Sequence, residues 1–314
     1  MLFIHLGMPK TGSSALQRAF HIASGEGRLP ILYPDKFRSN AVAHHALVGS
    51  LTSVDEEEET ICSFVELLKS HRHEDILISS EMFTNLIGPN RVTTIINLWR
   101  SSMQVIPAKL VIVVRRWDRL MESTYLQKIR FGSFGGSIDK FLSSRGRFME
   151  SFFTGLGVLK RELGESLAIA PYVENFDVLA LFENLARLPA GGLTGMKDRL
   201  PRTARYTSKS QALLLHLKKI GAEVSLDLDR RRVLRAISRG LLVFPEDQTA
   251  YTIITDKQAR ALQTRALSAA GMAGITEYTD AFGNIENVGV PFVTLNPALF
   301  SSLDLDLIAG CMAR

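Results

Sequence analysis

Short runs of apolar residues alternate, along the first half of the chain, with longer stretches in which apolar positions recur every three or four residues. The short runs are typical of buried parallel strands, and the longer stretches of the helices that connect such strands. We therefore expect an α/β fold with a central parallel sheet between layers of helices. The expected strands are Leu2–Leu6, Asp75–Ser79, Leu110–Val114 and Leu167–Val173. The expected helices are Ser14–Ala23, Glu56–His71, Asn90–Arg100, Trp117–Ile129, Phe148–Leu163 and Phe176–Leu188.

The pattern changes after Pro189, where a glycine-rich stretch leads into helical periodicity with no convincing strand. The helices expected in this part lie near Ser208–Ile220, Asp229–Leu242 and Asp256–Ala270. We therefore expect an α/β core over residues 1–190 and a mainly helical C-terminal extension over residues 191–314 that packs on the core.

Composition and charge limit the class of protein only loosely. The 314 residues are 46% apolar and 22% charged, which is typical of globular proteins. A net charge of +5 favours an anionic ligand but falls short of a dedicated nucleic-acid binder. Cys62 and Cys311 lie too far apart to indicate a disulfide scaffold or a metal-ligand cluster. No apolar run approaches the ~18 residues that span a bilayer, and the apolar start is too short for a signal peptide, so we expect a cytoplasmic protein.

The strongest local signal is the apolar run LFIHL, which is followed by a glycine-containing turn and then by a helix. Such a turn presents backbone N–H groups and the positive end of the helix dipole to an anion. We therefore expect a phosphate-binding loop and a fold of the P-loop type. The loop reads Gly7-Met8-Pro9-Lys10-Thr11-Gly12-Ser13-Ser14.

The loop departs from the Walker A pattern of nucleoside triphosphatases. That pattern requires a lysine directly after the second glycine, whereas Ser13 occupies this position and Lys10 precedes Gly12 by two residues. The next expected strands end in ILISSE and VIVVRR, so neither supplies the Asp that completes a magnesium site. The loop therefore suits a nucleotide with one 5′-phosphate and no obligatory metal.

The segment PKTGSS between the first strand and the first helix resembles the 5′-phosphosulfate loop of sulfotransferases that use 3′-phosphoadenosine 5′-phosphosulfate (PAPS). The chain is similar to the bacterial, carbohydrate-type members over roughly residues 2–190. The resemblance implies that PAPS is the donor and that adenosine 3′,5′-bisphosphate (PAP) is the product, with no metal. It implies that Lys10 contacts the bridging oxygen. It assigns the 5′-phosphate to Thr11, Gly12, Ser13 and Ser14.

A donor with a 3′-phosphate needs a second anion site, for which arginine is suited through bidentate contact. The expected strand KLVIVV runs into Arg115, and Ser123 follows eight residues later. This arrangement resembles the 3′-phosphate motif of the same family, which implies that Arg115 and Ser123 bind that phosphate. The residues that usually follow the arginine in the motif are replaced here by Arg116 and Trp117.

Transfer to a hydroxyl requires a base that accepts the proton of the acceptor. Glu81 directly follows the strand DILISS, and ligands of open α/β sheets bind at the carboxyl ends of strands. The position matches that of the base in cytosolic sulfotransferases, where it is a histidine. The pair His44-His45 is the alternative, with His44 ranked slightly above His45, and Ser80 is a candidate for holding the sulfate. We expect Glu81 and Arg115 at the carboxyl ends of neighbouring strands.

Two other functions compete with this interpretation. A P-loop kinase for a small molecule would need ATP and Mg²⁺. A non-catalytic module would sense the bisphosphate or bind RNA through an arginine stripe, but no aromatic residues accompany that stripe, so we expect no nucleic-acid partner. The acceptor is a small molecule or a carbohydrate that the sequence does not identify. The arginine stripe comprises Arg230, Arg231, Arg232, Arg235 and Arg239.

Overall fold

The computed structural model describes residues 1–39, 42–131, 133–200, 208–221, 252–284 and 293. By compactness the chain divides into two units, and the whole sheet lies in the first. The first unit comprises Met1–Arg116, Arg147–Pro201 and Thr264–Ile285. The second comprises the described residues within Trp117–Gly146, Arg202–Gln263 and Glu286–Arg314. The expected boundary at residue 190 stays a prediction.

A five-stranded, all-parallel sheet forms the centre of the first unit, in the order β2-β3-β1-β4-β5. Its central strand β1 pairs with β3 on one side and with β4 on the other, so that Ile4 is in register with both Ile78 and Leu110. The parallel sheet and the α/β class are thus confirmed. The strands are β1 (Leu2–His5), β2 (Ile31–Leu32), β3 (Asp75–Ser79), β4 (Ala108–Arg115) and β5 (Leu167–Tyr172).

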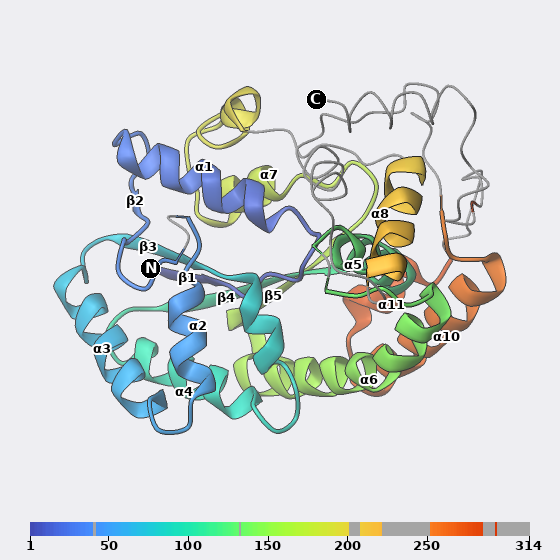
Figure 1. The fold of residues 1–314 in the computed structure, drawn as a ribbon. Coiled ribbons are helices and arrows are strands. Elements are labelled where there is room, and N and C mark those ends of the chain that lie inside the picture. Colours follow the sequence, from blue (N-terminus) through green and yellow to red (C-terminus); the bar gives the residue numbers. More distant parts are fainter. Residues whose placement is uncertain (40–41, 132, 201–207, 222–251, 285–292, 294–314) are drawn as a thin grey trace. The chain divides into compact units, whose positions relative to one another are not determined.

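Helices cover both faces of this sheet (Figure 1). One face carries α1 (Ser13–Gly25) and α7 (Val178–Leu185), which contact each other. The other face carries α2 (His45–Thr52), α3 (Glu57–Ser70) and α4 (Val92–Met103), of which α2 contacts α3 and α3 contacts α4. Three layers result, as the alternation of strand and helix patterns predicts.

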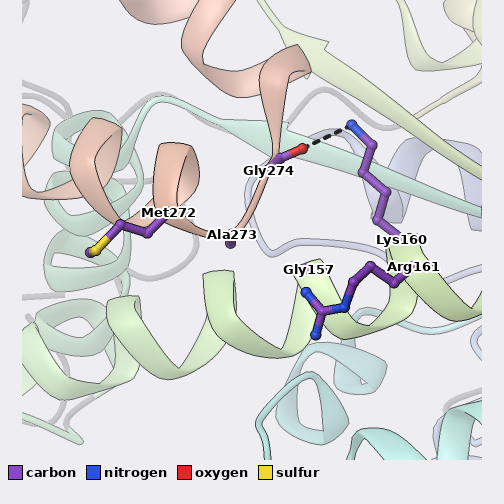
Figure 2. A pocket seen from close by; sticks show the side chains of 6 residues that line it. All are labelled: Gly157, Lys160, Arg161, Met272, Ala273 and Gly274. Atoms are coloured by element: carbon purple, nitrogen blue, oxygen red, sulfur yellow. Dashed lines mark hydrogen bonds between the residues drawn. The ribbon is translucent and has the colours of Figure 1, made fainter.

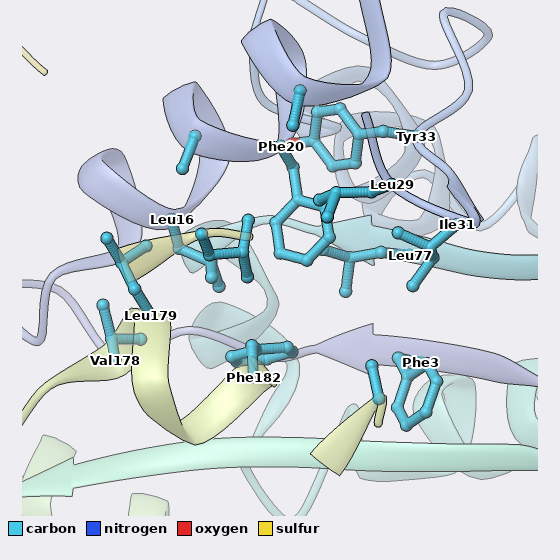
Figure 3. Close-up of a cluster of buried hydrophobic side chains, with 14 of the residues drawn as sticks. Phe3, Leu16, Phe20, Leu29, Ile31, Tyr33, Leu77, Val178, Leu179 and Phe182 are labelled. Carbon is cyan, nitrogen blue, oxygen red and sulfur yellow. The ribbon is translucent and has the colours of Figure 1, made fainter. Parts of the chain in front are cut away.

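The core between the sheet and the first of these helical layers is continuous (Figure 3). Phe20 of α1 meets Phe182 of α7 with 6.3 Å between ring centres, and both side chains are fully buried. Phe3 and Leu77 face them from the sheet in the same cluster. Burial of a side chain of this size stabilises the fold by roughly 1.5–3 kcal/mol. These contacts fix the position of α1, and with it the loop that precedes α1.

Some elements differ from the sequence-based expectation. Helix α6 (Ile138–Leu163) begins at Ile138 rather than at Phe148, because its first turns contain serine, arginine and glycine residues that blur the apolar period. Two short helices were not predicted, α2 and α11 (Thr276–Phe282). The remaining expected helices of residues 1–190 are confirmed within a few residues at each end.

The second unit contains α5 (Trp117–Phe131) and α8 (Ser208–Gly221), which contact each other. The carboxylate of Glu122 in α5 accepts hydrogen bonds from the Thr252 hydroxyl and the Ile253 N–H, both at 2.7 Å. Helix α10 (Asp256–Met272) matches another expected helix, so the described C-terminal part is helical. The expected helix Asp229–Leu242, the arginine stripe and Cys311 lie outside the described residues. No helix among the described residues is long and apolar enough to cross a membrane.

Gly155 in α6 tests the fit of this helix against the segment that follows β3. A Cβ at Gly155 would lie 2.5 Å from the carbonyl oxygen of Ile87 and 3.1 Å from the nitrogen of Gly88. We predict that Gly155→Ala lowers the free energy of unfolding by roughly 1–3 kcal/mol, the usual cost of overpacking. This loss should appear in chemical denaturation, although alanine is the better helix former by ~1 kcal/mol.

Gly271 in α10 provides the matched control, because a Cβ there would meet nothing within 4 Å. Gly271→Ala should leave stability unchanged or raise it by up to ~1 kcal/mol. If Gly155→Ala is as stable as the parent chain, the close approach of α6 to Ile87 is wrong.

Candidate functional site

The glycine loop lies at the carboxyl end of the central strand, between β1 and α1. Its backbone is left-handed at Gly7, Lys10 and Gly12, with φ of 38°, 67° and 87°. A Cβ at Gly7 would lie 2.9 Å from the Cα of Glu81, so only glycine allows the loop to pass this close to the end of β3. The Leu6 N–H donates to the Val111 carbonyl at 2.8 Å and ties the start of the loop to β4.

Backbone N–H groups are among the donors that the loop offers to an anion. Gly12 caps α1 without a side-chain hydrogen bond, which leaves the first N–H groups of the helix without a partner in the helix. In the described part of the chain, the N–H groups of Thr11, Gly12 and Ser13 donate to no backbone carbonyl. The hydroxyls of Thr11 and Ser13 both donate to the Met8 carbonyl, at 2.6 and 3.4 Å, and so stabilise the turn itself. Ser14 is exposed in the first turn of α1.

Arg115, the last residue of β4, reaches the loop from the neighbouring strand. Its Nη1 donates to the Lys10 carbonyl at 2.8 Å. Its guanidinium carbon lies 5.2 Å from the ring centre of Tyr172, the last residue of β5, at cation–π distance. The structure thus brings Arg115 and Lys10 together. Ser123 is half-buried in α5 and belongs to the second unit, so its part in a phosphate site stays a prediction.

Glu81 directly follows β3 and Ser80, and it begins the 3₁₀ helix η1 (Glu81–Leu86). Its Oε2 accepts a hydrogen bond from Gln17 Nε2 at 2.9 Å, and its Oε1 lies 3.5 Å from His45 Nε2. Burial alone would raise the pKa of this carboxyl group, but the contacts with His45 and Gln17 outweigh burial and lower the pKa to about 2. Glu81 is therefore an anion at neutral pH.

His44 is fully buried, and both of its ring nitrogens contact the backbone. Nδ1 accepts from the Ser79 N–H at 3.2 Å, and Nε2 donates to the Pro34 carbonyl at 2.9 Å. Burial is the main cause that lowers its pKa to about 4. These contacts favour a structural role for His44, whereas His45, the first residue of α2, is the histidine that contacts Glu81.

A buried polar chain continues from Glu81 into the sheet. Gln17 Nε2 also donates to Ser79 Oγ at 3.3 Å, and Ser79 Oγ lies 2.8 Å from His5 Nδ1. His5 is the last residue of β1, and burial lowers its pKa to about 4. Its Nε2 is buried without a hydrogen-bond partner among the described residues. The side chains that connect Glu81 to the sheet, Gln17, Ser79 and His5, are thus polar and neutral.

The strand order refines one expectation. Glu81 and Arg115 lie at the carboxyl ends of β3 and β4, but these strands are not direct neighbours, because β1 lies between them. The glycine loop that continues β1 therefore has the carboxylate on one side and the guanidinium on the other. The placement explains why Gly7 meets the Glu81 backbone while the Lys10 carbonyl meets Arg115.

Sequence reasoning missed Gln17, His5 and Tyr172 as parts of the site, and it ranked His45 slightly below His44. Gln17 follows Ser13 by one helical turn, a signal that could have placed it beneath the loop. His5 is a polar residue inside the apolar run LFIHL, next to the expected strand end, and this is a comparable signal for a place in the site. Nothing in the sequence distinguishes His45 from His44, because the start of α2 was not predicted.

One surface depression of the first unit lies elsewhere, between α6 and the turn before α11 (Figure 2). It has a volume of about 330 Å³. Its Lys160 donates to the Gly274 carbonyl at 3.1 Å and forms an ion pair with Glu277 at 2.8 Å. This lysine links two helices, and the depression contains none of the residues that the sequence marks for function.

Comparison with protein-family models gives no match, and no curated protein sequence matches the chain.

The two buried histidines predict how stability depends on pH. In the folded chain the pKa values of His5 and His44 are about 4, below the usual value of 6.5. As pH falls below 6.5, the unfolded chain takes up protons that the folded chain does not, so the free energy of unfolding should fall between pH 6.5 and pH 4. Each histidine contributes up to ~1.4 kcal/mol per pH unit.

Chemical denaturation of His44→Asn over this pH range should therefore show a shallower pH dependence than the parent chain. Replacement of His73, which is exposed, by Asn is the matched control. An equal pH dependence in the parent chain and in His44→Asn would contradict the neutral, buried state of His44.

Proposed function

We propose that this protein is a PAPS-dependent sulfotransferase, which transfers a sulfuryl group to a hydroxyl or amine of an acceptor. The observation that carries the proposal is the hydrogen bond from Arg115 to the Lys10 carbonyl. It joins Arg115, which the resemblance assigns to the 3′-phosphate, to the backbone of Lys10, whose side chain the resemblance assigns to the bridging oxygen. The family resemblance favours a carbohydrate acceptor.

The hydrogen-bond donors of the site fit an anionic nucleotide. The N–H groups at the start of α1 and the left-handed loop suit the 5′-phosphate, because such concave N–H arrangements bind anions. Arg115 suits the 3′-phosphate, because a planar guanidinium can bind a phosphate through two parallel hydrogen bonds. The loop hydroxyls of Thr11 and Ser13 are expected to act by shaping the turn.

The transfer then proceeds between Lys10 and Glu81. The acceptor oxygen forms a bond to sulfur as the bond between sulfur and the bridging oxygen breaks, and that oxygen leaves with its electron pair on PAP. The Lys10 ammonium neutralises the growing negative charge. The acceptor proton passes to Glu81. His44, the alternative base, is less suited to accept this proton, because both of its ring nitrogens bind the backbone.

The assignment of PAPS as the sulfuryl donor predicts which nucleotides bind. Isothermal titration should show that PAP binds without Mg²⁺ and more tightly than ATP. Tighter binding of ATP with Mg²⁺ would favour a small-molecule kinase instead. PAP binding without any transfer from PAPS would favour a non-catalytic module.

Arg115→Ala should abolish the preference for PAP over AMP. A charge-assisted hydrogen bond is worth roughly 1.5–3 kcal/mol, or about 10- to 150-fold in affinity. AMP affinity should fall less, through the lost support of the Lys10 carbonyl. Replacement of Arg199, which pairs with Glu26 at an exposed site, by Ala is the matched control. An unchanged preference in Arg115→Ala would mean that the 3′-phosphate binds elsewhere.

Substitutions of Lys10 and Glu81 should have different effects on kcat and on PAP affinity. The assay measures release of PAP from PAPS with a panel of sugars and aryl alcohols as acceptors. Lys10→Ala should lower kcat by at least ~10²-fold, the scale of preorganised electrostatic groups. Glu81→Gln should lower kcat by roughly 10²- to 10⁴-fold with PAP affinity nearly unchanged. His44→Ala should chiefly lower stability, because it removes contacts to Ser79 and Pro34. Full activity in Glu81→Gln together with a folded, inactive His44→Ala would make the histidine the base.

A further inference from the structure

We propose that His45 and Gln17 are positioning residues that hold the Glu81 carboxylate ionised and in one orientation, with His45 acting as an Nε2–H donor and not as a base. The role of Glu81 in transfer rests on the proposed function. The arrangement of the three side chains does not, so the two can be tested separately.

The tautomer of His45 follows from the hydrogen bonds of Ser80. Ser80 is fully buried, and its Oγ accepts from the Met82 N–H at 3.2 Å. Its own hydroxyl proton needs an acceptor, and among the described residues the acceptor within reach is His45 Nδ1 at 2.7 Å. Because Nδ1 accepts, the neutral ring carries its proton on Nε2, which faces Glu81 Oε1 at 3.5 Å.

The other carboxylate oxygen is fixed from a different helix. Gln17 in α1 is almost fully buried and directs one N–H to Glu81 Oε2 at 2.9 Å and the other to Ser79 Oγ at 3.3 Å. Since Gln17 uses both N–H groups, it cannot turn without losing its hydrogen bond to Ser79 or to Glu81. The carboxylate thus lies between donors from α1 and α2, and rotation about its terminal bond would break both contacts.

The charged and titratable groups around Glu81 are consistent with one ionised carboxylate. His5 of β1 and Tyr33, which follows β2, both interact with the Glu81 charge, and both are buried. Burial lowers the pKa of His5 to about 4, so it is neutral at pH 7. Burial likewise raises the pKa of Tyr33. The negative charge of Glu81 is therefore stabilised by the hydrogen bond from Gln17 and by the contact with His45.

This arrangement assigns different parts to the two candidate bases. The Glu81 side chain is 30% exposed and keeps further lone pairs for an acceptor proton. His45 already carries a proton on the nitrogen that faces Glu81, so it has no free lone pair on that side. A carboxylate held in this way takes up the acceptor proton late, once the bond between the acceptor oxygen and sulfur has largely formed.

Carboxyl ¹³C NMR of glutamate-labelled protein tests the proposal without any nucleotide. Glu81→Gln assigns the Glu81 signal. Followed from pH 8 down to pH 2, this signal should titrate in the parent chain only near the acidic end of the range, because the pKa is about 2. In His45→Leu the midpoint should rise by at least one pH unit, and His45→Gln, which restores an N–H near the Nε2 position, should reverse most of the rise. A Glu81 signal in His45→Leu that titrates as in the parent chain would overturn the proposal.

Two further measurements keep the test decisive. Gln17→Leu should raise the Glu81 midpoint in the same direction, and it serves as the second variant if His45→Leu does not fold. Long-range ¹H–¹⁵N spectra should show the His45 proton on Nε2, and a proton on Nδ1 alone would contradict the donor role.

The kinetic arm separates this inference from the proposed function. In PAPS-dependent transfer, His45→Leu should acquire an acidic limb in its pH–rate profile at the midpoint measured by NMR, and His45→Gln should lose it. If PAPS is no donor, the NMR result stands and the proposed function fails. If transfer occurs and the acidic limb does not follow the Glu81 midpoint, His45 has no positioning role in the reaction.

Discussion

The two-point contact of His44 with Ser79 holds the carboxyl end of β3 in place. The His44 N–H donates to the Ser79 carbonyl at 2.9 Å, and its ring Nδ1 accepts from the Ser79 N–H at 3.2 Å. On the other side of β3, Ser79 is in register with His5 of β1. A residue that precedes a short helix therefore completes the hydrogen bonding of a strand end, and buried backbone groups need such partners. Because Glu81 follows Ser79 by two residues, this contact also helps to fix the position of Glu81.

The central position of β1 determines the electrostatics of the site. Because β3 and β4 pair with opposite sides of β1, their ends place a carboxylate and a guanidinium around the glycine loop. Positive charge from Lys10 and Arg115 gathers with the N–H groups of the loop on one side, which suits a polyanionic ligand. The carboxylate of Glu81 contacts Gln17 and His45. The proposed anion-binding residues and the proposed base thus lie at the same edge of the sheet.

Most of the sheet could be predicted from the sequence, because parallel strands that are buried on both faces give continuous apolar runs. The loop was predicted from glycine spacing, and Arg115 from its place after such a run. The contacts within the site could not be predicted: Gln17 is 64 residues from Glu81, and no local period connects them. Helix α2 was missed because His44, which precedes it, makes no side-chain cap and so gives no start signal. Without that helix, His45 had no predicted partner.

Lys10 combines two demands that oppose each other. Its backbone φ of 67° lies in the left-handed region, where a residue with a Cβ is less stable than glycine by roughly 1 kcal/mol. For folding alone, glycine would be the better residue at this position, and the carbonyl that Arg115 binds would still be present. The ammonium is the one group that glycine cannot supply. Under the proposed function, backbone stability and catalysis therefore place opposite demands on Lys10, and substitutions selected for stability alone would converge on this residue.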